Sequence, residues 1–315
     1  MNIDIQKSIS RKQFLAALPL FAVIPKMGIA MNTEGFYPLS FSTLGCPDWN
    51  FEKIINFAKD NQYQGIEIRG ILHEMDLTKV PEFSNPEAIA VSLTKMKDRG
   101  LVFVDLGSSC ALHFPKGEER TKNLDEGKRF IDLASQLNCP YIRVFPNQLP
   151  KDRQESLNLI IEGLRELGRY ASGTGVTVLL ESHGELIYKK DLLAVMEGVA
   201  QPNVGLVWDI CNMWIATHEP PEEVYALLNP YIHHTHIKDL KIVYGKEEYV
   251  LLGTGVVPIF QAIDILYRNQ YPGYYSFEWE KWWHPEILDP HIALADYPVA
   301  MRKHFDKFLK MPNVL

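Results

Sequence analysis

From about residue 37 onward, short β-branched and aromatic runs alternate with longer segments whose apolar residues recur at helical spacing. Each run precedes one such segment, so the pattern predicts eight strand–helix units. The predicted strands are Tyr37–Thr43, Gly65–Arg69, Leu101–Gly107, Tyr141–Phe145, Val176–Glu181, Val204–Asp209, Ile232–Ile237 and Tyr274–Glu278. No Ser-, Gly- or Pro-rich linker separates the units, which favours one α/β domain, a closed (β/α)₈ TIM barrel over residues 36–315. An open doubly wound sheet is the alternative, and the absence of a GxGxxG turn weakens its dinucleotide-binding version.

Local signals place the helix boundaries. Asp48 is the expected N-cap of the first helix, whose apolar residues begin at Phe51. Asn85 followed by Pro86 combines an N-cap with proline at the first helical position. The last helix is expected over Ala293–Leu309.

The N-terminus has the order of an export signal. Lys7, Arg11 and Lys12 precede an apolar run, Phe14–Ile24, that is too short to span a bilayer. We expect residues 1–30 to be a cleaved signal, either general secretory or twin-arginine-like, with Lys12 in place of the second arginine. The mature protein is then expected to be periplasmic and free of the membrane. An amphipathic N-terminal arm is the alternative interpretation.

Composition narrows the range of ligands that the protein could bind. The 315 residues carry a formal net charge of −7, which argues against nucleic-acid binding and favours a small polar substrate. Cys46, Cys110, Cys139 and Cys211 show no CxxC spacing, which argues against structural zinc and against a disulfide framework. We expect them to be buried or near-site thiols.

Four consecutive predicted strands end in Glu181, Asp209, His236 and Glu278. The active sites of such barrels lie at the carboxyl ends of the strands, so these side chains should converge. Three converging carboxylates repel one another unless a cation neutralises them. Carboxylates with one imidazole suit Mn²⁺, Mg²⁺, Co²⁺ or Zn²⁺, with positions left for substrate oxygens. The pattern therefore predicts a divalent-metal site.

These residues resemble those of the xylose isomerase-like barrels, a superfamily of sugar-phosphate isomerases and epimerases, ketose 3-epimerases and inosose dehydratases. The resemblance covers nearly the whole chain after the signal and is carried by SFSTLG, GIEIRG, LLESHG, VWDICN, HIKD, a GTG turn and YPGYYSFEWE. It implies that Glu181, Asp209, His236 and Glu278 are metal ligands. It also implies that Glu181 and Glu278 serve as the acid/base pair, and it leads us to expect a homo-oligomer paired through helices on one side.

Proton abstraction next to a carbonyl needs a base and a means of stabilising an enediolate, and a carboxylate pair with a divalent ion provides both. Epimerisation or isomerisation of a free or glycosidic sugar is therefore the leading hypothesis, and elimination of a β-group by a lyase or dehydratase is the alternative. A non-catalytic sugar-binding protein is a third, which the intact ligand set disfavours. Asn212 replaces a histidine of the ketose 3-epimerases, and Lys238, Asp239 and Lys241 stand where those enzymes carry an arginine. The related DNA-repair endonucleases need that same histidine, so Asn212 argues against a nuclease.

Further polar and aromatic residues follow the predicted strand ends. The expected substrate contacts are His183, Asn212, Lys238, His73, His113 and Trp283. Lys238 has an alternative role as a rim charge paired with Asp239. Arg143 should point into the barrel, either towards its mouth or into a buried ion pair near Glu67 or Arg69.

Overall fold

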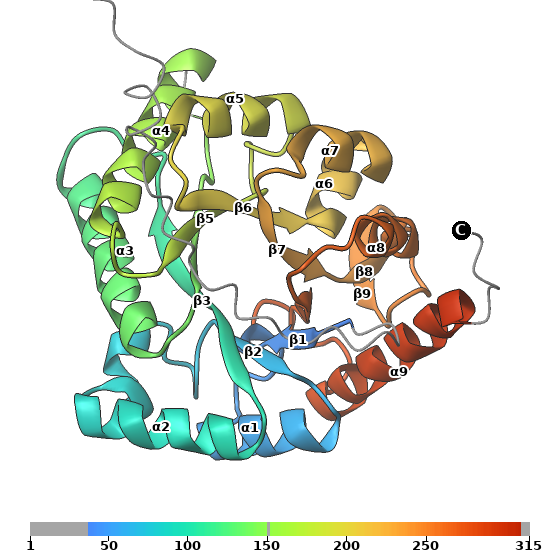
Figure 1. Ribbon diagram of the computed structural model, residues 1–315. Coiled ribbons are helices and arrows are strands. Elements are labelled where there is room, and N and C mark those ends of the chain that lie inside the picture. Colours follow the sequence, from blue (N-terminus) through green and yellow to red (C-terminus); the bar gives the residue numbers. More distant parts are fainter. Residues whose placement is uncertain (1–36, 150–151, 310–315) are drawn as a thin grey trace, which may run out of the picture. The chain divides into compact units, whose positions relative to one another are not determined.

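Eight parallel strands close into a barrel in the computed structural model, which describes residues 37–149 and 152–309 (Figure 1). The strands are β1 (Leu39–Ser42), β2 (Gly65–Ile68), β3 (Val102–Ala111), β4 (Tyr141–Phe145), β5 (Thr177–Glu181), β6 (Val204–Asp209), β7 (Ile232–Ile237) and β10 (Tyr275–Phe277). β1 pairs with both β2 and β10, which closes the ring. The predicted single-domain TIM barrel is confirmed, whereas the expected export signal lies outside the described residues.

Helices form the outer layer around this barrel (Figure 1). They are α1 (Phe51–Asp60), α2 (Pro86–Asp98), α3 (Glu118–Gln136), α4 (Arg153–Tyr170), α5 (Lys189–Val199), α6 (Ile210–Thr217), α7 (Pro221–Leu228), α8 (Ile259–Arg268) and α9 (Pro290–Leu309). Short 3₁₀ turns are η2 (Thr43–Gly45), η3 (Leu77–Lys79) and η4 (Pro81–Phe83). None of the helices in the described part of the chain is long and apolar enough to cross a membrane.

The strands are buried on both faces, which explains why their sequences read as nearly continuous apolar runs. All six residues of β6 are buried, for example, because one face fills the barrel and the other meets the helices. The helices are instead apolar on one side, and α1 buries Ile54, Ile55 and Ala58 against the strands. The four cysteines are free and buried, as predicted.

The caps decide where the first helices begin. The side chain of Asn50, and not the expected Asp48, caps α1 by accepting a hydrogen bond from the backbone N–H of Lys53 (2.9 Å). Asp48 lies further from the helix and accepts from His73 Nε2 (2.6 Å). The predicted Asn85 cap is confirmed, since its Oδ1 accepts from the backbone of Ala88.

A hairpin that the periodicity did not predict follows β7. Strands β8 (Asp239–Val243) and β9 (Lys246–Val250) pair antiparallel through the two-residue turn Tyr244-Gly245. Both turn residues have positive φ (50° and 76°), as tight hairpins require. The many charged residues of this segment hide its alternation, because both of its strands are partly exposed to water.

Asp239 anchors this hairpin to the following turn. Its carboxylate accepts hydrogen bonds from four backbone N–H groups, those of Leu240, Gly253, Gly255 and Val257, at 2.8–3.3 Å. A side chain at Gly255 would collide with this carboxylate. The role explains the GTG segment, and it excludes the ion pair with Lys238 that was the alternative for that lysine.

Replacing Asp239 with alanine is expected to lower the free energy of unfolding by about 2–4 kcal/mol, because several backbone N–H groups lose a charged acceptor. Urea unfolding followed by circular dichroism measures this change. Asp60→Ala, at an exposed site on α1, serves as the matched control and should shift stability by less than about 0.5 kcal/mol. Equal stabilities for the two variants would contradict the anchoring role.

Candidate metal centre

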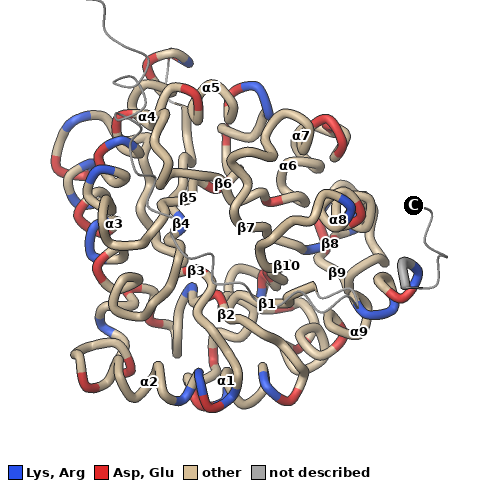
Figure 2. Tube along the Cα trace, in the orientation of Figure 1, with Lys and Arg blue, Asp and Glu red and all other residues tan. Residues whose placement is uncertain are grey.

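Charged residues of both signs are interspersed on the outer helices (Figure 2). A separate set of charged residues is buried inside the mouth of the barrel. Glu181 and Asp209 are the last residues of β5 and β6. His236 lies one residue before the end of β7, and Glu278 directly follows β10. Each offers a ligand atom within 4.8 Å of those of the other three, and all four are buried. The structure thus brings together the four residues expected to bind a metal, and the binding itself stays a prediction.

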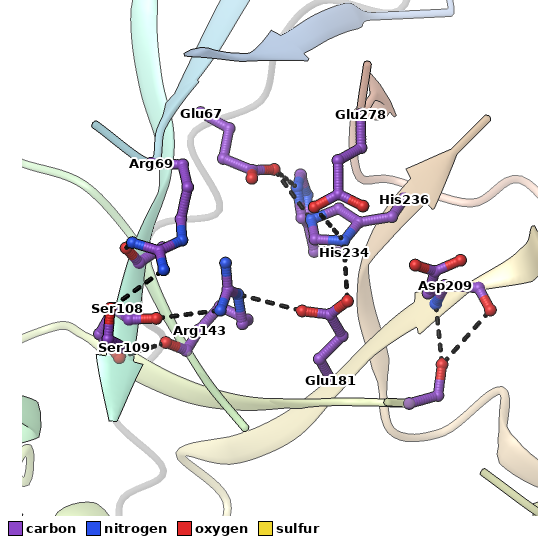
Figure 3. A network of polar contacts seen from close by, with 12 residues as sticks. Glu67, Arg69, Ser108, Ser109, Arg143, Glu181, Asp209, His234, His236 and Glu278 are labelled. Carbon is purple, nitrogen blue, oxygen red and sulfur yellow. Dashed lines mark hydrogen bonds and ion pairs between the residues drawn. The ribbon is translucent and has the colours of Figure 1, made fainter. Parts of the chain in front are cut away.

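His236 is oriented with one ring nitrogen towards these carboxylates (Figure 3). Its Nε2 donates to Glu67 Oε2 (3.1 Å), which leaves Nδ1 facing Glu181 Oε1 at 3.4 Å and Glu278 Oε1 at 3.3 Å. This Nδ1 is buried and makes no hydrogen bond to any described residue. Proteins orient metal-binding histidines in the same way, with the second nitrogen on a carboxylate. The donor set therefore fits a divalent ion.

Glu67 of β2 lies beneath this centre and contacts several of its side chains, whereas the sequence analysis named it only as a possible neighbour of a buried ion pair of Arg143. Besides His236, its Oε2 accepts from His234 Nε2 (2.9 Å) and from the Ser276 hydroxyl (3.2 Å). Burial raises the pKa of Glu67, but the two histidines outweigh burial and hold the pKa well below its usual range. Glu67 thus stays an ionised acceptor.

Buried carboxyl groups exceed buried cations around the centre. The carboxyl groups are Glu67, Asp105, Glu181, Asp209, Glu278 and Glu280, and the cations apart from the histidines are Arg69, Arg143 and Lys238. Burial, together with the charge of Glu67, raises the pKa of Asp105 well above its usual range. Burial lowers the pKa of His236, yet Glu278, Glu67 and Glu181 outweigh burial and raise it well above its usual range. Without a metal, the site therefore balances its charge by retaining protons.

Lys238 lies inside the site and not at its rim. Its ammonium is fully buried and donates to Asp209 Oδ2 (2.6 Å), to Glu278 Oε2 and to Glu280 Oε1 (2.8 Å). Burial raises the pKa of Glu280 to about 7, with Lys238 acting in the opposite direction. The lysine thus links two of the four candidate ligands to a third carboxyl group.

Arg143 holds Glu181 from the other side. Its Nε lies 3.1 Å from Glu181 Oε2, Nη1 donates to the Ser108 carbonyl (2.9 Å), and the guanidinium lies over the ring of Phe145. The buried ion pair is therefore with Glu181 and not with Glu67. Burial raises the pKa of Glu181, but His236 and Arg143 outweigh burial and hold it well below its usual range. Glu181 is accordingly ionised.

A pocket of about 200 Å³ opens above these residues. Its lining consists of Leu44, Arg69, Arg143, Phe145, Glu181, His183, Asn212, Lys238, Tyr249, Glu278, Glu280, Trp283 and His284. The volume suits a molecule the size of one sugar ring. Four of the six expected substrate contacts, namely His183, Asn212, Lys238 and Trp283, are among these residues.

The other two expected contacts lie outside the pocket lining. His73 bonds to Asp48 and packs beside Trp282, and His113 packs against Phe114. Several lining residues were not predicted as contacts, among them the polar residues Arg69, Tyr249 and Glu280. Arg69 and Glu280 each stand two positions after a site residue, Glu67 or Glu278, so strand alternation was the signal that could have found them.

Asp209 has a second function, which explains the position of Asn212. Its Oδ1 accepts from the backbone N–H of Asn212 (2.9 Å) and thereby caps α6, a helix that the periodicity did not predict. Its Oδ2 is left for Lys238. The cap places Asn212 on the first turn of α6, at the edge of the pocket.

Comparisons with known proteins identify relatives of this chain. The 3-dehydroshikimate dehydratase of Bacillus anthracis is 25% identical over 230 residues, which are 68% of this chain and 78% of that protein. The crystal structure of the probable 3-DHS dehydratase AsbF from the same organism covers 84% of this chain and 98% of its own, with 19% identity and a TM-score of 0.70.

Two further solved structures share the fold. A xylose isomerase-like TIM barrel protein from Mycobacterium smegmatis, in complex with magnesium, is 20% identical, with a TM-score of 0.66 and coverage of 89% and 100%. The 3-keto-D-glucoside 4-epimerase YcjR of E. coli is 15% identical, with a TM-score of 0.67 and coverage of 85% and 100%. The sequence model of one family matches residues 50–295, most of the chain. The protein therefore belongs to the xylose isomerase-like TIM barrel family.

Proposed function

We propose that this protein is a divalent-metal-dependent enzyme that removes a proton next to a carbonyl group of a sugar-like substrate, and that it acts as an isomerase or epimerase. The observation that carries the proposal is the convergence of three buried carboxylates and one imidazole at the mouth of the barrel. The ligands would be Glu181, Asp209, His236 and Glu278. When bound there, Mn²⁺, Mg²⁺, Co²⁺ or Zn²⁺ supplies Lewis-acid stabilisation of negative charge on substrate oxygens.

Glu181 is the proposed base. It is ionised, and its two oxygens are oriented by His236 and Arg143, so its carboxylate is held in place before the substrate binds. Glu278 is the proposed proton donor on return; it must carry a proton before that step, and the ammonium of Lys238, which donates to its Oε2, is an adjacent proton source. Removal and return of a proton by two carboxylates gives epimerisation when both steps occur at one carbon, and isomerisation when the proton returns to the neighbouring carbon.

Elimination of a β-group by a lyase or dehydratase is the second candidate. The sequence similarity to a 3-dehydroshikimate dehydratase over 230 residues favours it. The replacement of the epimerase histidine by Asn212 favours it as well. In this reaction Glu181 keeps its role as base, and Lys238, which lies beside Glu278, would supply positive charge near the leaving oxygen.

The proposal includes substrate contacts through His183, Asn212, Lys238 and Trp283, which line the pocket. It also includes export of the chain with cleavage within residues 1–30, supported by the basic, apolar and small-residue order of that segment. A periplasmic enzyme would act on free or glycosidic sugars.

Glu181→Gln tests the base directly. With Mn²⁺ and a panel of keto-sugars and keto-glycosides in D₂O, the wild-type chain is expected to incorporate deuterium at the carbon next to the carbonyl, as measured by NMR. The variant is expected to lose this exchange by about 10²- to 10⁴-fold, because general-base catalysis disappears. Glu162→Gln, at an exposed position on α4, is the matched control and should exchange at the wild-type rate.

The same experiment separates the two reactions. Deuterium in unchanged or epimerised sugar indicates isomerase or epimerase chemistry, and enone absorbance with loss of water indicates elimination. If the purified protein binds no divalent ion and Glu181→Gln turns over substrate at the wild-type rate, both proposed reactions are contradicted.

Metal binding is expected to release a proton and to weaken as the pH falls. The raised pKa of His236 means that the imidazole is protonated in the metal-free protein at neutral pH, and a metal requires Nδ1 without its proton. The affinity for Mn²⁺ should therefore rise with pH, by up to about tenfold per unit for each proton displaced, until the pH exceeds that pKa.

Calorimetric Mn²⁺ titrations in buffers of different ionisation enthalpy measure the released protons. His236→Gln should lose both the binding and the release, whereas His73→Gln, outside the pocket lining, should keep both. An affinity that does not change between pH 6 and pH 8 would refute this linkage.

A further inference from the structure

Two arginines lie next to each other on the wall of the pocket opposite Asp209 (Figure 3). Arg69 directly follows β2 and Arg143 belongs to β4, with Gly107 of β3 between them. A side-chain carbon at Gly107 would lie 2.7 Å from Arg69 Cδ and 2.9 Å from Arg143 Nη2. The glycine therefore makes room for two guanidinium groups in one place.

Their charges are compensated unequally. Arg143 pairs with Glu181, but no carboxylate among the described residues lies within ion-pair distance of Arg69, which is only 4% exposed. The hydrogen bonds of Arg69 go to neutral acceptors, the Ser109 hydroxyl (3.0 Å), the Gly107 carbonyl (3.4 Å) and the Met75 sulfur. A buried charge without an opposite charge is costly, so this position is built for an anion that the chain itself does not supply.

Electrostatics agree with this geometry. Burial and the positive charge of Arg143 together lower the pKa of Arg69 to about 9, and more distant carboxylates offset only part of their effect. An anion bound between the two guanidinium groups would relieve their repulsion. Nη2 of Arg143 makes no hydrogen bond to a described residue, so donors from both arginines remain for a ligand.

We propose that the substrate carries an anionic group, a carboxylate or a phosphate, that binds between Arg69 and Arg143. This inference rests on the proposed function only in placing the substrate in the same pocket. A guanidinium matches the oxygens of either group with paired N–H donors, whereas a neutral sugar would leave the charge of Arg69 uncompensated. The anion and the reacting carbonyl would then occupy opposite ends of the 200 Å³ pocket, the anion at the arginines and the carbonyl at the carboxylates.

Three probes with the same ring test the inference: D-glucose, D-glucuronate and D-glucose 6-phosphate, neutral, carboxylate and phosphate at one carbon. Calorimetry with the full chain, with and without Mn²⁺, is expected to show at least tenfold tighter binding of one anion than of glucose. The anion that binds more tightly identifies the group. Arg69→Met should weaken that anion by about 10- to 100-fold and leave the affinities for glucose and Mn²⁺ within about twofold.

Arg69→Lys retains a charge without the paired donors and should weaken the anion less than Arg69→Met does. It also carries the test if Arg69→Met fails to give a wild-type circular dichroism spectrum. Arg129→Met, at a partly exposed position on α3, is the matched control and should bind all probes as the wild-type chain does. Equal affinities for the three probes, no binding of either anion, or an anion preference that survives Arg69→Met would each overturn the inference.

The outcome is separable from that of the proposed function. If the wild-type chain binds no Mn²⁺ but still prefers the anion to glucose, the proposed metal-dependent activity is refuted and the anion site is supported. Normal Mn²⁺ binding without an anion preference would refute the anion site alone.

Discussion

Compensation of negative charge at the barrel mouth is the constraint on which the rest of this site depends. Closing eight parallel strands brings Glu181, Asp209, His236 and Glu278 within reach of one another and removes them from water. Ionised carboxylates in such a place need nearby positive charge or bound protons. Lys238 supplies part of that charge, and the protonated His236 supplies another part in the metal-free state. A divalent ion can take over the role of these protons, which couples metal binding to pH.

The supporting residues fix the directions in which the candidate ligands point. Glu67 holds His236 from below, Arg143 holds Glu181 from the side, and the cap of α6 orients Asp209. Each of these partners comes from a different strand or helix, so the barrel as a whole keeps the centre in place. Asp239 has a similar role further from the centre. It fixes the hairpin whose Tyr249 lines the pocket.

The pocket is electrostatically divided. Asp209 and Glu278 lie on one side of the site, and Arg69 and Arg143 lie on the other (Figure 3). Lys238 contacts both of these carboxylates. A substrate with a carbonyl at one end and an anionic group at the other would match both walls, whether the reaction then returns the proton or expels a leaving group. The division limits the orientation of the substrate, because reversing it would place an anion against carboxylates.

The sequence by itself determined the barrel, the boundaries of β4, β6 and β7, and the four residues that converge, because buried parallel strands read as apolar runs and their last residues must meet at one end. Only the tertiary structure decided the partners: Glu67 under His236, Arg143 on Glu181, and Lys238 among three carboxyl groups. These contacts join strands far apart in the chain, and their distances depend on strand register and side-chain direction. The hairpin was missed because polar residues obscure its periodicity, and α6 was missed because its sequence, ICNMWIAT, is apolar at most positions and shows no helical spacing.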